Sequence, residues 1–281
     1  MHFTKMHGAG NSFILVDNMK GELAGVDLPR LAAAACARHT GLSADGMIVV
    51  TPAPAGSEAD FAMLFYNSDG TLGEMCGNGA RCICRYGFEH GYAKDASSIR
   101  CLATAGVVSG RRITAEQYEV RLNDPTVIDL HRCVSAASEE FDCAYVELGC
   151  PGIPHAVVEV EESVFADLDA LRRTGCLLRN HTAFPKGANV TFAALRADGT
   201  VRALTYERGV EDFTLACGTG CGSTTVALLL RGRIPSSPLQ IDMPGGRLSV
   251  NAEANAAAGK AWNIYLTGPT AIVAEGEYNN Y

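Results

Sequence analysis

The chain has 281 residues, 47% of them hydrophobic and 19% charged, which is enough for a sizeable core in one large domain or two medium ones. Its net charge of −8 offers no basic surface for nucleic acid or anionic lipid, so we expect a small-molecule ligand and neither of those partners. We also expect a cytoplasmic protein without a membrane span or signal peptide, because apolar runs are short and none follows the N-terminal charges.

Eleven cysteines are present, an odd number in a long chain. Disulfide frameworks are typical of short secreted chains with even numbers of cysteines, so we expect reduced thiols here. Small buried cysteines are common in protein cores, and a catalytic role must therefore come from their context.

The predicted elements of the first part of the chain begin with a surface helix over residues 28–38. A strand over 61–67 leads through a polar turn into a helix that ends at Gly91. The polar stretch after Asn123-Asp-Pro125 marks the boundary between two halves.

The second part is predicted to contain a surface helix over 163–173 and a hairpin that joins 190–192 to 201–204. The strand over 201–207 precedes a helix that ends at Gly232, and another hairpin turns at Pro244-Gly-Gly246. This mixture of helices, strands and hairpins indicates an α+β fold.

The chain contains an internal repeat. The segment Glu74-Met-Cys-Gly-Asn-Gly-Ala-Arg-Cys82 returns in altered form as Leu215-Ala-Cys-Gly-Thr-Gly-Cys-Gly-Ser223, with Cys76 and Cys217 lying 141 residues apart. Asn11, in Gly-Asn-Ser-Phe, is interpreted as the counterpart of Asn189, in Ala-Asn-Val-Thr. Two copies at a domain-sized period indicate two homologous halves that face each other rather than a solenoid.

Each repeated motif places a cysteine directly before a Gly-x-Gly that opens a helix. Unpaired backbone N–H groups and the positive end of the helix dipole meet there, which favours a thiolate and a bound carboxylate. The glycines let an anion approach the backbone closely. A single copy could equally be a glycine-rich turn with a buried cysteine.

Two such turns on one cleft would suit racemisation. That reaction takes a proton from one face of a carbon and returns a proton to the other face, so it needs a base and an acid on opposite sides. A thiolate and a thiol can exchange those roles, and the N–H groups would stabilise charge on the carboxylate. None of the five lysines lies in a phosphate-binding loop beside the cysteines, although the residues alone leave a Schiff-base lysine for pyridoxal phosphate open.

The sequence resembles the diaminopimelate epimerases of the lysine and peptidoglycan pathway along nearly the whole chain. The matching motifs, in the family's order, are Met6-His-Gly-Ala-Gly-Asn11, Asn67-Ser-Asp-Gly70, Met75-Cys-Gly-Asn-Gly-Ala-Arg-Cys82, Pro154-His155, Asn189-Val190, Glu207-Arg-Gly209, Ala216-Cys-Gly-Thr-Gly220, Met243-Pro-Gly-Gly246 and Leu266-Thr-Gly-Pro269.

The resemblance implies two pseudo-symmetric halves, each a curled mixed sheet around a central helix. The last strand, near residues 268–281, would return to the first half, which gives residues 1–125 plus 267–281 and residues 126–266 as the two domains. It implies no cofactor and no metal. The expected partner is an amino-acid substrate, and a second copy of the chain, as a homodimer, is the one macromolecular partner considered.

The resemblance also assigns roles to individual residues. Cys76 and Cys217 match the catalytic cysteines, and His155 and Glu207 match residues that position and tune them. The distal end of the substrate would be held by Asn11, Asn67, Asn189 and Arg208, and the reacting carboxylate by the turns at Gly77, Asn78, Gly218 and Thr219. Taken from the residues alone, Asn11 and Asn67 could be turn formers, His155 a core histidine and Arg208 a strand-end charge.

Departures from the family's pattern bear on the substrate. The family's Gly-Asn-Pro-His reads Gly152-Ile-Pro-His155 here, and the branched hydrocarbon of Ile153 donates no hydrogen bond. Loss of one partner from a buried charged group costs about 1 to 3 kcal/mol, which is enough to reassign a substrate. Smaller changes are Gly10-Asn-Ser-Phe13, Gly41-Leu-Ser-Ala-Asp45 and the Val-Glu-Asp-Phe that follows Gly209.

Three hypotheses follow. The first is epimerisation of LL- to meso-diaminopimelate, and the second is racemisation of another amino acid, such as histidine or one with an apolar or short side chain, because of Ile153. The third is a thiol-based metal or redox protein that uses Cys76 and Cys217. The other cysteines show no metal-ligand spacing, since Cys82-x-Cys84 lacks a second pair, and Cys82 and Cys221 are expected to pack within helices.

Overall fold

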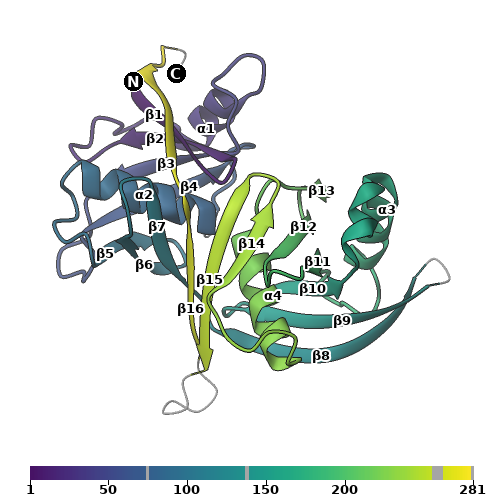
Figure 1. The fold of residues 1–281 in the computed structure, drawn as a ribbon. Coiled ribbons are helices and arrows are strands. Elements are labelled where there is room, and N and C mark those ends of the chain that lie inside the picture. The colour runs from purple at the N-terminus through teal and green to yellow at the C-terminus, as the bar shows by residue number, and fades with distance from the viewer. Residues whose placement is uncertain (74–75, 137–138, 255–261, 280–281) are drawn as a thin grey trace. The chain divides into compact units, whose positions relative to one another are not determined.

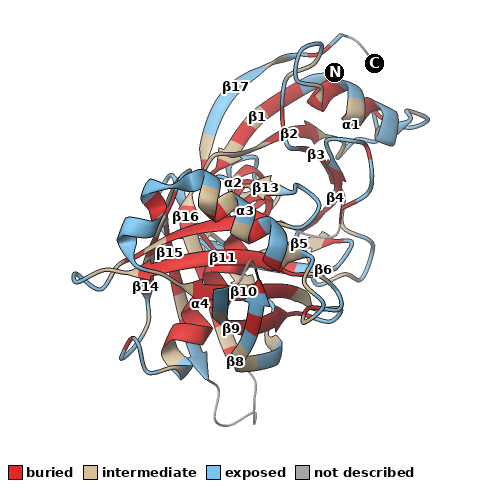
Figure 2. Ribbon diagram, turned by 90° about the vertical axis from the view of Figure 1, so that its right-hand side faces the viewer, coloured by how far each residue is buried: buried red, intermediate tan, exposed pale blue. Residues whose placement is uncertain are grey.

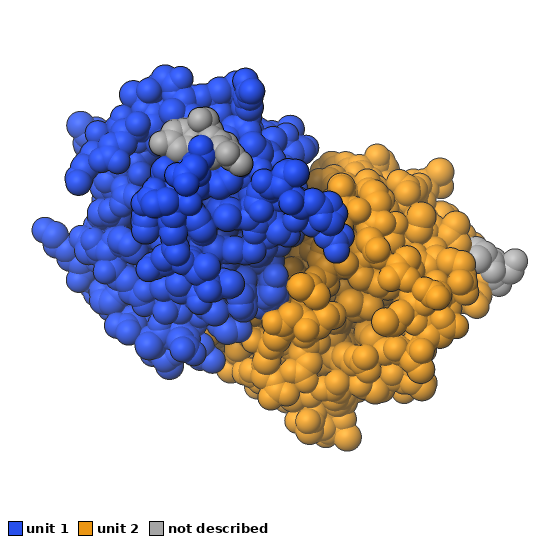
Figure 3. Space-filling view, turned by 90° about the horizontal axis from the view of Figure 1, so that it is seen from above, with its two compact units in different colours: residues 1–120, 268–281 blue, residues 121–267 orange. Residues whose placement is uncertain are grey.

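A computed structural model of the chain describes residues 1–73, 76–136, 139–254 and 262–279. The chain divides into two compact units, residues 1–120 with 268–281 and residues 121–267, which Figure 3 distinguishes by colour. The first boundary between the units, after Val120, lies within the strand Gln117–Leu122, whereas the sequence predicted a boundary after Pro125. Residues 280–281 of the expected last strand and residues 74–75 of the first motif lie outside the described part of the chain.

The elements of unit 1 appear in Figure 1. They are β1 (His2–Gly8), β2 (Asn11–Asp17), α1 (Leu28–Cys36), β3 (Gly46–Thr51), β4 (Phe61–Asn67), α2 (Gly77–Glu89), β5 (Ile99–Ala103), β6 (Gly106–Arg112), β7 (Gln117–Leu122) and β17 (Ala271–Glu277).

The elements of unit 2 follow the same plan. They are β8 (Pro125–Ala136), β9 (Glu139–Leu148), β10 (Ile153–Glu159), the 3-10 helix η1 (Glu162–Ala166), α3 (Leu168–Arg179), β11 (Asn189–Leu195), β12 (Val201–Glu207), β13 (Asp212–Phe213), α4 (Gly218–Leu230), β14 (Leu239–Met243), β15 (Gly246–Ala254) and β16 (Trp262–Pro269).

The two units share one strand order. In the described residues of unit 1, neighbouring strands run β17-β1-β2-β3-β4-β5-β6-β7, with parallel pairs only at β2–β3 and β4–β5. In those of unit 2 they run β8-β9-β10-β11-β12-β14-β15-β16, with parallel pairs at β10–β11 and β12–β14. The parallel pairs fall at the same two places, so the expected α+β fold of two similar halves, each a mixed sheet, is confirmed.

One helix in each unit packs on the inner side of its curled sheet. Helix α2 contacts β1, β2, β5 and β6, and α4 contacts β8, β9, β10, β11 and β15. Because α4 is enclosed, ten of its residues are buried and apolar and small side chains lie all round it. Figure 2 shows α4, β10 and β11 largely buried.

The predicted helix ends are confirmed. Gly91 and Gly232 follow α2 and α4 with φ of +74° and +66°, a conformation that glycine adopts without strain at a helix C-terminus. The backbone N–H of Arg233 donates to the carbonyl of Leu228 over 2.9 Å and closes the last turn of α4.

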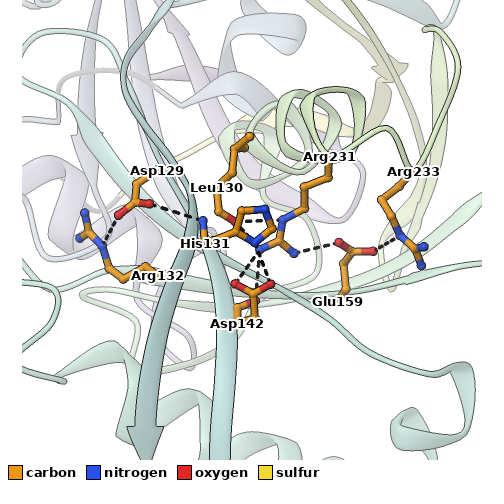
Figure 4. Close-up of polar contacts among 8 residues, drawn as sticks. All are labelled: Asp129, Leu130, His131, Arg132, Asp142, Glu159, Arg231 and Arg233. Atoms are coloured by element: carbon orange, nitrogen blue, oxygen red, sulfur yellow. Dashed lines mark hydrogen bonds and ion pairs between the residues drawn. The ribbon is translucent and has the colours of Figure 1, made fainter.

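The C-terminus of α4 is held by a buried arginine (Figure 4). The side chain of Arg231 is 7% exposed and bonds the carboxylates of Glu159 on β10, at 2.9 Å, and Asp142 on β9, at 3.1 Å. Its Nε donates to the carbonyl of Leu130 on β8 over 3.0 Å. A cation at this end also complements the helix dipole, and α4 is thereby fixed to three strands of its sheet.

The other predicted elements are mostly confirmed. Helix α1 and the hairpins β11–β12 and β14–β15 lie where the sequence placed them. The single surface helix predicted over 163–173 is wrong, because η1 ends at Ala166 and α3 begins at Leu168. Asp167 separates them, since its side chain accepts a hydrogen bond from the N–H of Ala170 and caps α3.

The packing of α2 predicts an unusual response to alanine. A Cβ at Gly87 would lie 2.3 Å from the ring of Phe61, whereas Gly→Ala in a helix normally gains up to about 1 kcal/mol. Overpacking costs about 1 to 3 kcal/mol, so Gly87→Ala is expected to lower the thermal midpoint measured by circular dichroism. Adding Phe61→Leu should recover part of the lost thermal midpoint. A Gly87→Ala variant as stable as the parent would contradict this packing.

Candidate functional site

Cys76 lies at the N-terminus of the enclosed helix of unit 1. It follows β4 and precedes α2 as the N-cap residue, in an extended conformation with φ −131° and ψ 124°. Its carbonyl accepts the N–H of Ala80 over 2.7 Å, which begins the helix. The thiol therefore stands beside the N–H groups of the first helical turn, as the motif predicts.

An asparagine faces this thiol. The Sγ of Cys76 lies 3.3 Å from the Oδ1 of Asn11, and the Nδ2 of Asn78 lies 3.4 Å from the same oxygen. The Nδ2 of Asn11 donates to the Oδ2 of Asp45 over 2.8 Å. Since a carboxylate can only accept, Asp45 fixes the orientation of the Asn11 amide and turns its oxygen toward the thiol.

A buried arginine braces the same turn. Arg81 is fully buried in α2, with Nη2 donating to the Oδ1 of Asn78 over 2.8 Å and Nη1 to the carbonyl of Gly77 over 3.3 Å. A Cβ at Gly8 would lie only 2.8 Å from the carbonyl oxygen of Asn78 and 3.3 Å from the Nη2 of Arg81. Strand β1 and Arg81 thus both pack against the Cys76 turn.

Asn67, at the end of β4, lies in a turn of its own. Its N–H donates to the carbonyl of Thr71 over 2.8 Å, and its Nδ2 donates to the Oγ1 of Thr71 over 3.0 Å. The side chain is exposed. The turn-former interpretation describes this conformation, and a substrate-binding role for Asn67 stays a prediction.

Cys217 occupies the equivalent place in unit 2. It is the N-cap residue of α4, with φ −121° and ψ 104°, and it is 6% exposed. Its Sγ lies 3.6 Å from the Oγ1 of Thr219, which in turn lies 2.9 Å from the Nε2 of His155. The predicted residues Cys217, Thr219 and His155 are thus brought together, with Gly218 in the buried first turn of α4.

His155 is a neutral, buried histidine. Burial, and secondarily the charge of Arg208, lower its pKa to about 3. The Nδ2 of Asn189 lies 3.4 Å from the Nε2 of His155, while the Oδ1 of Asn189 accepts the N–H of Arg208 over 2.8 Å. The amide of Asn189 is therefore oriented with its donor toward Nε2, while the buried Nδ1 of the ring makes no hydrogen bond within the described residues.

A carboxylate lies close to the Cys217 thiol. The Oε1 of Glu207 accepts the hydroxyl of Thr214 over 2.6 Å. Burial raises the pKa of Glu207, although hydrogen bonds from Thr214 and Cys217 oppose that change. Burial also raises the pKa of Cys217 well above its ordinary value, and the charge of Glu207 adds to the effect.

The lowered thiol pKa expected at both helix starts is therefore wrong for Cys217. The hydrogen bond from Thr219 and the N–H of Gly220 do lower its pKa, as expected at a helix N-terminus. They are outweighed by desolvation of a fully enclosed sulfur. Cys217 accordingly rests as a thiol at neutral pH.

Arg208 follows the last residue of β12 and is exposed. Its N–H is held by Asn189, and its Nη1 donates to the carbonyl of Lys186 over 3.0 Å. The first contact fixes the backbone of Arg208 and the second fixes one edge of its guanidinium. This planar group is suited to bind a carboxylate.

Comparison of the two units corrects one expectation. Asn189 is the first residue of β11, whose counterpart in unit 1 is β3, so its partner position is Gly46. Asn11 begins β2, whose counterpart β10 begins at Ile153. The proposed pairing of Asn11 with Asn189 is therefore wrong, because short Asn-containing motifs look alike wherever a strand begins.

The same comparison shows how the two turns differ. Ile153 stands where unit 1 has Asn11, and Glu207 stands where unit 1 has Asn67, since these two residues end β12 and β4. At these two equivalent positions unit 1 therefore has amides, and unit 2 has a hydrocarbon and a carboxylate.

Sequence reasoning missed three residues near the thiols. Asp45 and Arg81 lie inside motifs that it quoted, but they were given no role, and Thr214 carried no motif signal. A charged residue at a position that the motif requires to be buried, such as Arg81, could have been singled out from the helix pattern alone.

The remaining cysteines fall into two groups. Cys82 and Cys221 are buried in α2 and α4, as expected of packing residues. The other buried ones are Cys36, Cys84, Cys101 and Cys143, and the exposed ones are Cys133, Cys150 and Cys176. Among the described residues, no three His, Cys, Asp or Glu side chains gather as they would around a metal ion. No helix in the described ranges is both long and apolar enough to cross a bilayer.

Comparison with known proteins decides the family. The sequence profile of the family "Diaminopimelate epimerase" matches residues 3–121 and 150–273. The diaminopimelate epimerase of Carboxydothermus hydrogenoformans is 33% identical, with 99% of each chain covered, and that of Xanthomonas campestris pv. campestris is 36% identical, with 99% of this chain and 96% of the relative covered. The chain belongs to the diaminopimelate epimerase family.

Membership of the diaminopimelate epimerase family makes the protein an isomerase of the epimerase class. Solved structures share the fold at low identity. A Bacillus anthracis protein of the PhzF phenazine biosynthesis family has a TM-score of 0.76 at 14% identity, covering 100% of this chain and 99% of its own. A hydroxyproline epimerase from Agrobacterium vitis has a TM-score of 0.70 at 18% identity, covering 98% and 91%.

The carboxylate beside Cys217 yields a direct prediction. Glu207→Gln removes a negative charge and keeps an acceptor for Thr214, so the pKa of Cys217 should fall. Because one pKa unit changes the thiolate fraction tenfold, alkylation of Cys217 by iodoacetamide at pH 8 should accelerate by up to about tenfold. Peptide mass spectrometry would measure this, with exposed Cys176 as internal reference and Glu253→Gln as matched control. An unchanged or slower rate at Cys217 would refute the assignment.

Proposed function

We propose that this isomerase interconverts LL- and meso-diaminopimelate without pyridoxal phosphate, with Cys76 and Cys217 exchanging the roles of base and acid. The observation that carries the proposal is the duplication: each of two topologically equal units begins its enclosed helix with a cysteine N-cap. Relatives that match the chain over nearly its whole length are named diaminopimelate epimerases.

The chemistry requires the thiols to act on opposite faces of one carbon. In one direction a thiolate takes the α-proton, the electron pair passes into the adjacent carboxylate, and the other thiol gives its proton to the opposite face. The sulfur that lost its proton is then the thiolate, so the reverse direction starts from the complementary state. No redox partner is needed.

Stabilisation of the intermediate would come from the helix starts. We assign the reacting carboxylate to the N–H groups at Gly77, Asn78, Gly218 and Thr219, in the first turns of the two helices, where negative charge would be stabilised. Donors fixed by Arg81 on one side, and by the enclosed position of α4 on the other, need little reorganisation during the reaction.

The surroundings of the two thiols support a division of labour at rest. Burial and Glu207 favour the protonated form of Cys217, which suits it to be the acid of the first half-reaction. Thr219 and neutral His155 continue from its sulfur as a chain of hydrogen-bonding groups. We assign the distal amino-carboxylate end to Asn11, Asn67, Asn189 and Arg208, with no cofactor.

A second candidate is racemisation of a different amino acid, and Ile153 favours it. Its position at the start of β10 corresponds to that of Asn11 at the start of β2, so a polar group is replaced by hydrocarbon at a strand start within this unit. A substrate with an apolar or short side chain would lose nothing from this exchange.

The proposal is tested by proton exchange in heavy water. The purified protein, free of pyridoxal phosphate and kept under reductant and chelator, should interconvert the two isomers and incorporate deuterium at Cα. Cys76→Ala and Cys217→Ala should each abolish interconversion, since the acid–base pair contributes about 10²–10⁴-fold or more, whereas Cys176→Ala should not.

A panel of amino acids separates the two candidates. Faster exchange with diaminopimelate than with any other amino acid supports the first candidate. Failure with diaminopimelate, together with exchange of another amino acid, would establish the second, and Ile153→Asn should then raise activity toward diaminopimelate.

A further inference from the structure

A buried carboxylate outside the cysteine turns anchors a group of contacts in unit 2. Glu147, near the end of β9, is 5% exposed. Its Oε1 accepts the hydroxyl of Tyr145 over 2.6 Å, and its Oε2 accepts the Nζ of Lys186 over 2.8 Å. The Lys186 side chain is 60% exposed, so the ion pair reaches from the core to the surface.

Lys186 connects this carboxylate to the arginine of the proposed substrate site. Its ammonium is held by Glu147, while its backbone carbonyl accepts the Nη1 of Arg208 over 3.0 Å. Asn189, three residues later, accepts the N–H of Arg208. The segment 186–189 therefore makes two hydrogen bonds to Arg208, and Lys186, the first residue of that segment, is ion-paired with Glu147.

Glu147 also supports the start of β10. A Cβ at Gly152 would lie 2.4 Å from the Oε2 of Glu147, so the backbone just before Ile153 rests against the carboxylate. Unit 1 has an analogous support, because His7 on β1 accepts the N–H of Gly10 just before Asn11 over 3.2 Å. In each unit, a polar side chain near the end of one strand thus contacts the backbone just before the next strand begins: His7 before β2 and Glu147 before β10.

Glu147 is ionised at neutral pH in this setting. Burial opposes ionisation, but hydrogen bonds from Lys186 and Tyr145 hold the pKa of the carboxyl below its usual value. The ion pair is charge-assisted on a largely buried acceptor, which makes it stronger than an exposed surface pair.

We propose that Glu147 and Lys186 are positioning residues for substrate recognition: together they set the guanidinium of Arg208 and the entry of β10, and so the affinity for the substrate's distal carboxylate. The inference rests on the proposed function of Arg208. The two residues act through Arg208 and not on the reacting carbon, so their loss should weaken binding and spare proton transfer at the cysteines.

The test is the split between KM and kcat, measured with the amino acid that the parent protein turns over fastest. Lys186→Met and Glu147→Gln should each raise KM by about tenfold, the effect of losing one charge-assisted contact, with kcat within about twofold of the parent. Lys186→Arg should restore KM. The KM of the double variant should not exceed the higher KM of the two single variants, because both changes break the same interaction.

Controls separate this role from a purely structural one. Glu162→Gln breaks the exposed ion pairs to Arg196 and Arg202 in the same unit and should leave KM unchanged. Glu147→Gln keeps the volume of the side chain, so it serves if Lys186→Met fails to fold. A fall in kcat with KM unchanged, or no change in either constant, would overturn the inference while leaving the proposed function intact. A parent protein that turns over no amino acid would refute both.

Discussion

The enclosure of one helix by a curled sheet is the constraint on which the rest of the structure depends. In a helix surrounded on most sides, the side chains must be small, apolar or hydrogen-bonded, and the first N–H groups must find partners away from bulk water. The glycines after Cys76 and Cys217 allow neighbouring side chains to approach that first turn. A Cβ at Gly220 would lie only 3.0 Å from the hydroxyl of Thr191 and 3.1 Å from that of Thr205. At Cys217 such an N-cap sets a buried sulfur beside the N–H of Gly220, a place where an acid or base with an anion site is useful.

The two units have kept this arrangement and changed what surrounds it. Around Cys76, the amide of Asn11 is oriented by Asp45, and the turn is braced by Arg81. Around Cys217, the carboxylate of Glu207 takes the place of the Asn67 amide, neutral His155 lies beyond Thr219, and the thiol is held in its protonated form. A duplicated scaffold thus carries two chemically different sulfurs, which suits a reaction that needs one base and one acid at a time.

Much of this was predictable from the sequence. The strands over 61–67 and 201–207 and the helix ends at Gly91 and Gly232 follow from local patterns, since hydrophobic periodicity and glycine stops act within a few residues. The break at Asp167 was missed because an apolar periodicity continues through η1 into α3 while the cap depends on one side chain. The pairing of Asn11 with Asn189 failed because strand register is set by long-range contacts. The predicted direction of the Cys217 pKa shift was wrong because burial of a thiol depends on the tertiary structure. The roles of Asp45, Arg81 and Glu147 beside the turns could not be predicted because they depend on the pairing of distant strands.

The central claim is that two sulfur atoms act on one carbon. The most direct measurement is a crystal structure of the protein with an unreactive analogue of diaminopimelate that keeps both carboxylates. The account predicts the Sγ atoms of Cys76 and Cys217 in contact with the same tetrahedral carbon from opposite faces, with its carboxylate on the N–H groups of both helix starts. A bound analogue touched by only one of the two sulfurs, with the other in a separate compartment, would contradict it.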